Sequence, residues 1–335
     1  MPHRVTALYA ALVAANLLAW GWALAAFHAH PALLGTALLA YGFGLRHAVD
    51  ADHVAAIDNV TRKLMHEGKR PVAVGFFFAL GHSSIVLVAA TAIAASATPL
   101  QHRYPGLVDA GGTIGAAVSA TFLLAIAAVN AALLVAISRR LGAARRGGAY
   151  RAEEIETLLE RRGLLAWVLR RLFRLISRSW HMYPLGLLFG LGFDTASEIG
   201  LLGIAAAEAV KGLPISSILV FPALFTAGMS LADTTDGVLM IGAYGWAVIN
   251  PIRKLCSNLA ITGLSVVVAA LVGGVEALGL VAGKLGLAGG VWDMVSAAND
   301  NSGALGYVII ALFVASWALS MLVYRLMGYD KISSV

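Results

Sequence analysis

Residues 46–59 of the chain read RHAVDADHVAAIDN, and the interpretation of the whole sequence starts from this stretch. It carries one arginine, two histidines and three aspartates, whereas its surroundings are mostly Ala, Leu, Gly and Val. Over 335 residues, 59% are hydrophobic, only 13% are charged, and the mean hydropathy is +0.81. This composition indicates a membrane protein, because soluble domains carry about twice that charged fraction. Ionisable side chains are costly inside a bilayer, and a stretch with this many of them therefore predicts a functional site.

The apolar residues form long runs that predict an all-α, polytopic membrane protein. A helix crosses a bilayer with roughly 20 mostly apolar residues. Continuous runs of this length lack the alternation of barrel strands, which argues against a transmembrane β-barrel. The first run is too long for a cleavable signal peptide and is expected to be retained. We expect about eight transmembrane helices in a single transmembrane domain, residues 1–335, near residues 5–27, 33–59, 71–97, 108–138, 184–210, 214–249, 258–283 and 303–327.

Positive charge in the connections predicts the orientation. Residues 139–180 form a long basic loop with eleven arginines between Arg139 and Arg178, and residues 61–71 and 250–255 are also basic. Because basic connections stay in the cytoplasm, we expect all three there, together with both termini, in a protein of the cytoplasmic (inner) membrane. The net charge of +6 lies mostly in this loop, which favours contact with anionic lipid headgroups over nucleic acid. The single cysteine, Cys256, excludes internal disulfides and a multi-thiolate metal centre.

The polar side chains of the opening stretch are arranged as a cation site would be. Successive helix residues advance by about 100°, so five of the six share one face, and Asp52 is the exception. Either the helix is locally irregular here or Asp52 faces a different neighbour. The five are Arg46, His47, Asp50, His53 and Asp58. Imidazole and carboxylate groups at i, i+3 and i+6 suit a borderline divalent cation such as nickel, cobalt, zinc or copper. The alternative is a self-neutralising polar seam, but three carboxylates facing one arginine leave negative charge in a low dielectric.

Three other apolar runs carry polar groups of the same type. Residues 78–86, FALGHSSIV, include a histidine followed by two serines, and this histidine alone is equally well explained by helix packing. Residues 189–200, FGLGFDTASEIG, and 228–237, GMSLADTTDG, each hold two acidic residues three or four positions apart. Such pairs repel in hydrocarbon unless a cation is present. Four runs with this chemistry favour a shared site.

A faint internal repeat links the second and third runs to the fifth and sixth. Residues 43–45, FGL, precede 81–83, GHS, by 38 positions, and 189–191, FGL, precede 228–230, GMS, by 39. Segments three crossings apart run through the membrane in opposite directions. This pattern predicts an inverted repeat with a site near the midplane, as in many secondary transporters.

RHAVDADHV, GHSSIV, LGFDTASEI and GMSLADTTD resemble the four signatures of the nickel/cobalt transporter (NiCoT) family, and the resemblance covers nearly the whole chain. Val54, Ser84, Ile85 and Ser197 depart from the family pattern without removing a ligand. The resemblance implies high-affinity uptake of Ni2+ or Co2+, with the metal handled first by His47, Asp50, Asp52 and His53. The remaining predicted metal ligands are His82, Asp194, Glu198, Asp233 and Asp236, with Arg46, Asp58, Ser83, Thr195 and Met229 in supporting roles.

The sequence therefore predicts a secondary transporter of Ni2+ or Co2+, with no cofactor and no enzymatic activity. It has no GxxxxGK[ST] loop for a nucleotide. A dication entering the cell gains about 4.6 kcal/mol from a potential of 100 mV. One alternative is a divalent-metal exporter or a proton-coupled carrier. A membrane-embedded metalloenzyme is the other, although three histidines within the runs are too few for a diiron centre.

Overall fold

The structure is a computed structural model, and it describes residues 2–96, 105–144, 176–191, 196–247, 251–301, 306–312 and 314–315. These residues contain helices and no strands, which confirms the all-α prediction. Most of the basic loop, residues 145–175, lies outside them. The helices are α1 (Pro2–Phe27), α2 (Pro31–His47), α3 (Ala51–His66), α4 (Val74–Ser96), α6 (Pro105–Ala144), η1 (Ser179–His181), α9 (Met182–Phe189), α10 (Ala196–Val210), α11 (Ile215–Ile218), α12 (Val220–Ala247), α13 (Pro251–Leu285) and α14 (Val291–Asp300).

Prolines divide the apolar sequence into helices. Pro31, Pro105 and Pro251 are the first residues of α2, α6 and α13, and Pro214 directly precedes α11. The first turn of a helix has no intrahelical partner for its N–H groups, so a residue without an N–H is tolerated there. These three helices begin near the starts of apolar runs, but the runs expected near residues 33–59 and 184–210 are each divided between two helices, α2 and α3 in one and α9 and α10 in the other.

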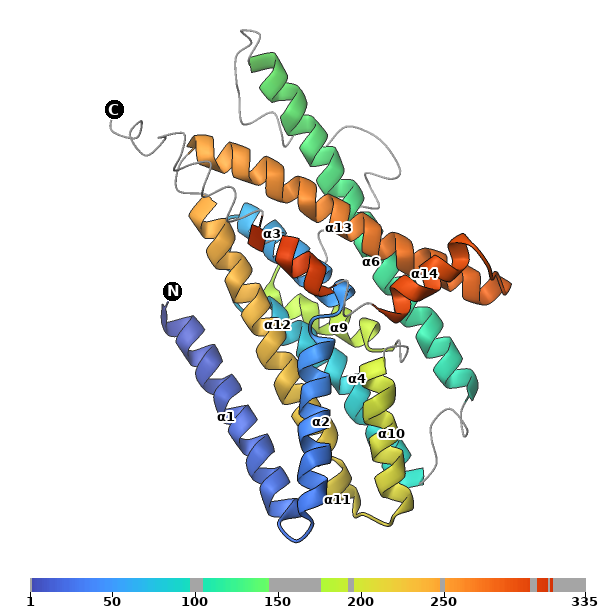
Figure 1. Ribbon diagram of the computed structural model, residues 1–335. Coiled ribbons are helices and arrows are strands. Elements are labelled where there is room, and N and C mark those ends of the chain that lie inside the picture. Colours follow the sequence, from blue (N-terminus) through green and yellow to red (C-terminus); the bar gives the residue numbers. More distant parts are fainter. Residues whose placement is uncertain are drawn as a thin grey trace.

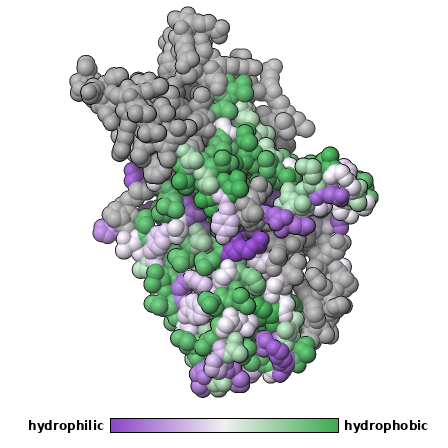
Figure 2. Space-filling view, viewed as in Figure 1, coloured by the Kyte–Doolittle hydropathy of each residue, from purple (hydrophilic) through white to green (hydrophobic). Residues whose placement is uncertain are grey.

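Several helices have the length and surface of membrane spans. Among the described residues, four helices are long and apolar enough to cross a bilayer, within residues 3–27, 74–95, 215–242 and 263–285, and the bent pair α2 and α3 makes a fifth if counted as one span. Leu17, Leu18, Leu38 and Val88 are 61–75% exposed, and Figure 2 shows apolar residues over much of the visible face. A surface of this kind faces lipid. The count of eight crossings stays a prediction.

The second apolar run is broken in the middle, which corrects the expectation of one continuous helix near residues 33–59. α2 ends at His47 and α3 begins at Ala51, with a bend of 51° between them. Asp50 has the extended backbone of an N-cap residue (φ −62°, ψ 145°). A helical wheel drawn through residues 46–59 therefore fails across the break, and Asp52 belongs to the new helix rather than to the back of the old one.

The break lies inside a bundle of α2, α4, α10 and α12, with α1 outside it and α6 and α13 packed together obliquely across one end (Figure 1). Glycines bring α2 and α12 into backbone contact. A Cβ at Gly44 would overlap the carbonyl oxygen of Phe225, and one at Gly228 would lie 2.8 Å from that of Tyr41. This close approach brings the end of α2 against the amino-terminal third of α12.

The pair formed by α4 and α9 packs in the same reciprocal way. A Cβ at Gly81 would overlap the carbonyl oxygen of Tyr183, and one at Gly186 would overlap that of Phe78. Both pairs use a glycine on each helix against a backbone carbonyl of the other, three residues before its glycine. By this contact pattern Gly44 corresponds to Gly186. The FGL match in the sequence instead pairs Gly44 with Gly190, one helical turn later. The inverted repeat itself stays a prediction.

Candidate metal centre

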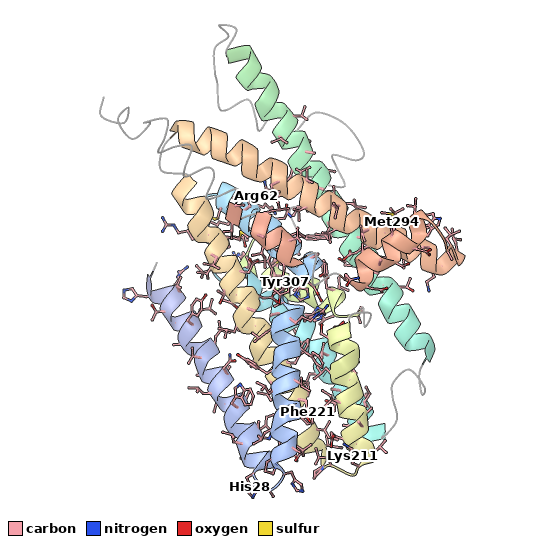
Figure 3. All side chains as sticks on the ribbon, in the orientation of Figure 1. His28, Arg62, Lys211, Phe221, Met294 and Tyr307 are labelled. Carbon is pink, nitrogen blue, oxygen red and sulfur yellow. The ribbon has the colours of Figure 1, made fainter. Side chains whose placement is uncertain are left out.

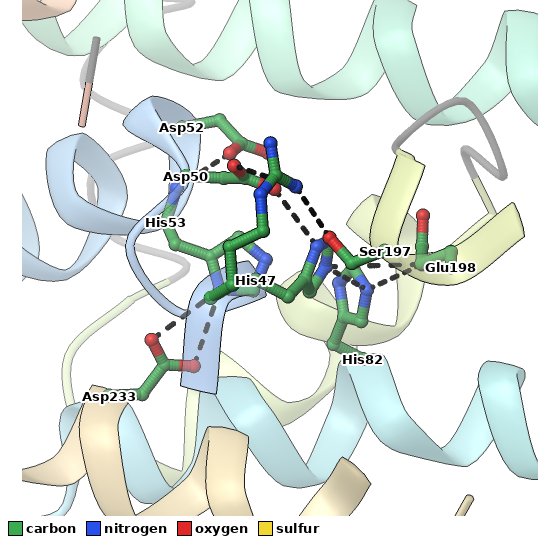
Figure 4. Close-up of polar contacts among 9 residues, drawn as sticks. His47, Asp50, Asp52, His53, His82, Ser197, Glu198 and Asp233 are labelled. Atoms are coloured by element: carbon green, nitrogen blue, oxygen red, sulfur yellow. Dashed lines mark hydrogen bonds and ion pairs between the residues drawn. The ribbon is translucent and has the colours of Figure 1, made fainter. Parts of the chain in front are cut away.

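Three histidines from three helices converge beside the break between α2 and α3. His47 is the last residue of α2, His53 lies in the first turn of α3, and His82 is in the middle of α4. Their ring centroids are 4.6–4.9 Å apart. One ring nitrogen of each lies within 4.8 Å of those of the other two, and all three side chains are buried (Figure 4). Such a convergence of imidazole nitrogens is able to hold a metal ion.

Two of these imidazoles are oriented by a carboxylate. Nδ1 of His47 lies 3.0 Å from Oδ2 of Asp50, and Nδ1 of His53 lies 3.3 Å from Oδ2 of Asp233. Metal-binding histidines usually use one ring nitrogen in this way, because the carboxylate fixes the tautomer and leaves the other nitrogen for the metal. Nε2 of His53 is buried and has no hydrogen-bond partner. The contacts of both rings therefore direct Nε2 toward the centre.

The third imidazole shares its nitrogen between two neighbours. Nε2 of His82 lies 2.9 Å from Nε2 of His47 and 2.9 Å from Oε1 of Glu198, which is itself 4.0 Å from Nε2 of His47. Two imidazole nitrogens this close need a proton or a cation between them, since two lone pairs repel. Glu198 is fully buried. This corner of the site therefore offers two nitrogens and one oxygen to a positive guest.

Helix ends supply part of the electrostatics. Asp50 stands at the N-cap of α3 but its side chain makes no cap hydrogen bond, because its carboxylate contacts His47 instead. Asp52 lies in the first turn of α3, where its Oδ1 accepts from the backbone N–H of His53 at 2.9 Å. Glu198 lies in the first turn of α10. The amino ends of both helices favour these negative charges through their dipoles.

One arginine reduces the negative charge. Nη1 of Arg46 donates to Oγ of Ser197 at 2.7 Å and lies 3.8 Å from Oδ1 of Asp50. The three carboxylates that contact the histidines are at most 1% exposed. If these three and the neighbouring Asp52 are all ionised, Arg46 compensates one charge and three remain. Buried charges of this kind require a partner.

Buried aromatic rings pack against the histidines of the centre. The ring of Phe78 contacts that of His53 with centroids 4.8 Å apart, and the ring of Phe225 contacts that of His47 at 5.5 Å. Phe189 stacks edge-on against Phe78 at 5.2 Å. These side chains exclude water from two of the histidines, so the electrostatic attraction for an ion is weakly screened.

The structure brings some of the predicted site residues together and places others elsewhere. The structure brings Arg46, Asp52, the three histidines and their carboxylates together. It places Asp58 elsewhere, since its Oδ2 accepts from Ser265 of α13 at 2.8 Å, and Met229 lies in an apolar cluster. Ser83 is buried with an unpartnered hydroxyl. Asp236 lies three residues beyond Asp233 on α12, with an unpartnered buried Oδ2. Asp194 and Thr195 lie outside the described residues.

Sequence reasoning missed three residues of the site. Ser197 was noted only as a departure from the family pattern, yet it accepts the hydrogen bond from Arg46. Phe78 and Phe225 were not singled out. Each phenylalanine precedes a signature residue by four positions, His82 and Met229 respectively. This spacing was the available signal in the sequence, because residues four positions apart on a helix lie on the same face, one turn from each other.

Fold and site together define a helical membrane protein with a candidate metal centre inside its bundle. Comparison of the sequence with known protein families shows which family it belongs to. A family model described as high-affinity nickel-transport protein matches residues 33–323, and the chain belongs to that family.

Three relatives illustrate the family. The high-affinity nickel transport protein of Cupriavidus necator is 57% identical over 327 residues, which cover 98% of this chain and 93% of the relative. The nickel transporter NicT of Mycobacterium tuberculosis is 46% identical, with 96% of this chain and 89% of the relative covered. The cobalt transport protein NhlF of Rhodococcus rhodochrous is 40% identical, with 87% and 82% covered. No solved structure matches the chain.

Proposed function

We propose that this protein is a secondary transporter that takes up Ni2+ or Co2+ across the cytoplasmic membrane. The observation that carries the proposal is the convergence of His47, His53 and His82, buried between helices of a membrane protein and within 4.8 Å of one another. The names of the relatives, most of them nickel transporters and one a cobalt transporter, support the choice of metal. Imidazole suits both ions.

The spacing of the nitrogens supports a shared ion. Ligand atoms about 2.1 Å from a metal lie about 3.0 Å apart at a right angle and about 3.4 Å apart at a tetrahedral angle. Nε2 of His47 and Nε2 of His82 are already 2.9 Å apart. The nitrogen of His53 has to move inward from the present limit of 4.8 Å. A small closure of α3 on α4 then completes a three-nitrogen site, with Oε1 of Glu198 as a fourth donor.

Charge balance supports a dication. Asp50, Asp52, Glu198 and Asp233 contribute up to four negative charges and Arg46 one positive charge. A divalent ion cancels two of the three that remain. Arg46 thereby keeps the ion from binding too tightly to leave, and transport requires binding that is both favourable and reversible.

The fold offers a route that needs no nucleotide. The ends of broken helices at mid-membrane are characteristic of secondary transporters, in which one repeat moves against the other around a fixed site. The reciprocal glycine contacts of α2 with α12 and of α4 with α9 supply two similar interfaces for such a movement. Asp236, with its unpartnered oxygen beyond Asp233, stands where an ion leaving the centre along α12 would next find a carboxylate. A potential of 100 mV supplies about 4.6 kcal/mol for a dication.

The direction of transport rests on the proposed topology, with eight crossings, the basic loop and both termini in the cytoplasm. Export through the same site is the competing function. The burial of all three histidines suits a small ion and leaves little access for the larger substrate of a metalloenzyme. The carboxylates and imidazoles are then transport ligands rather than catalytic groups.

Uptake of radiolabelled nickel by cells that express the protein tests the proposal. Wild type should accumulate nickel above cells without the protein, and His47→Ala, His53→Ala and His82→Ala should each lose most of this accumulation. His28→Ala is the matched control, because His28 is exposed at the tip between α1 and α2 (Figure 3). Loss of nickel from preloaded cells would instead indicate export. Equal accumulation by wild type and the three variants would remove the proposed site.

A further inference from the structure

A second polar feature lies far from the histidines, in an open pocket of about 580 Å3. The amino end of α1, the connection from α3 to α4 and the segment before α9 form it. Its size is within the range of about 300–1,000 Å3 that small-molecule sites occupy. Four of its lining residues are cationic, two are serines and none is acidic; the six are Arg4, Lys69, Arg70, Arg178, Ser177 and Ser179.

One of the four cations is used to hold the wall of the pocket. Nζ of Lys69 donates to Oε2 of Glu67 at 2.6 Å and to the backbone oxygen of Ser177 at 2.8 Å. This joins the α3–α4 connection to the segment before α9. The lining also contains three guanidinium groups and two hydroxyls. Guanidinium groups bind phosphate oxygens in a bidentate manner, and hydroxyls add further donors.

The position of the pocket indicates which kind of phosphate-bearing molecule is able to reach it. The carboxyl end of α3 and the amino ends of α1, α4 and α9 surround it, and the proposed topology places all of these ends at the cytoplasmic surface. Trp180 directly follows the lining residue Ser179 and is 52% exposed. Exposed tryptophans in membrane proteins lie at the depth of the headgroups. The pocket is therefore at the level of lipid phosphates rather than in the bulk cytoplasm.

We propose that this pocket binds the phosphate of an anionic phospholipid headgroup from the inner leaflet. The positive-inside rule explains cations on this side of the membrane, but it does not require them to line one cavity together with two serines. Basic pockets between transmembrane helices on the cytoplasmic side bind anionic headgroups in this way. The proposal shares only the orientation of the chain with the proposed function, since no metal ligand lines the pocket.

Thermal unfolding of the full chain, purified in a neutral detergent, tests it. Dioleoylphosphatidylglycerol should raise the Tm in a saturable manner, whereas dioleoylphosphatidylcholine should not. The double variant Arg4→Gln/Arg178→Gln should need about tenfold to thirtyfold more phosphatidylglycerol for the same rise, since each cation near a headgroup contributes measurably. Lys211→Gln is the matched control, because it removes a lysine at the opposite end of the molecule (Figure 3). It should respond as the wild type does.

Three results would overturn the proposal. They are an unchanged response of the double variant, an equal loss in Lys211→Gln, and a rise with inorganic phosphate alone that matches the rise with phosphatidylglycerol. The unliganded Tm of each variant shows whether it folds. If the double variant does not fold, two single variants replace it. Arg178→Lys keeps the charge and should lose less affinity for phosphatidylglycerol than Arg178→Gln. Nickel uptake by the same variants is a separate readout, so a failed lipid test leaves the proposed transport function intact.

Discussion

Replacing Glu198 by glutamine should weaken nickel binding strongly while leaving the shape of the site nearly unchanged. Oε1 of Glu198 lies 2.9 Å from Nε2 of His82 and 4.0 Å from Nε2 of His47. Even at about 4 Å, farther from the ion than a direct donor lies, a carboxylate gains about 8 kcal/mol of Coulomb energy with a dication at an effective dielectric constant of 20. Most of that is offset by the desolvation of both partners. Removal of carboxylates that support metal ligands typically costs about 10–100-fold in affinity, so we expect at least this loss.

Isothermal titration of the purified protein with Ni2+ measures the effect. Glu208→Gln is the matched control, because Glu208 lies on the same helix, α10, and its partner is Lys211 at 2.8 Å rather than a histidine. Its affinity should stay within about threefold of wild type. The reasoning is refuted if both variants bind nickel as the wild type does, or if Glu208→Gln loses as much affinity as Glu198→Gln.

Three further outcomes follow from the contacts of individual side chains. Asp233→Asn should reduce nickel affinity about 10–100-fold in the same titration, because it removes the charge that orients an imidazole 3.3 Å away; unchanged affinity would exclude this role. Gly44→Ala should destabilise the protein by about 1–3 kcal/mol in thermal unfolding because its Cβ overlaps α12, whereas Gly42→Ala, with open space around its Cβ, should not; equal Tm values would refute the close packing. Asp58→Ala should lower the Tm through loss of the bond from Ser265 but keep nickel affinity within about threefold, and a large loss of affinity would place Asp58 in the site.

The helical fold could be predicted because long apolar runs and prolines mark where helices begin and end. The break at residues 48–50 could not, since nothing in RHAVDADHV interrupts a helix as proline or glycine would. Two contacts accompany the break. One is local, between Asp50 and His47, and the other is tertiary, the α2–α12 contact at Gly44 near the end of α2. The off-face position of Asp52 was the only sign of it in the sequence.

The candidate site was predictable as a set of residues but not as an arrangement. Histidine and carboxylate in an apolar run are recognisable because they are costly there. Their pairing is set by contacts over long separations, as between His53 and Asp233 or His82 and Glu198, 180 and 116 positions apart. The sequence also could not show which of the two aspartates of α12 lies beside a histidine. In the structure Asp233 faces an imidazole, whereas Asp236 has an unpartnered oxygen.

X-ray absorption spectroscopy of the nickel-loaded protein tests the central claim most directly. The account predicts a nickel ion bound by nitrogen and oxygen only, with the scattering signature of about three imidazoles, and loss of about one imidazole in each of His47→Ala, His53→Ala and His82→Ala. A sulfur ligand, or an imidazole signature that these three substitutions leave unchanged, would contradict it.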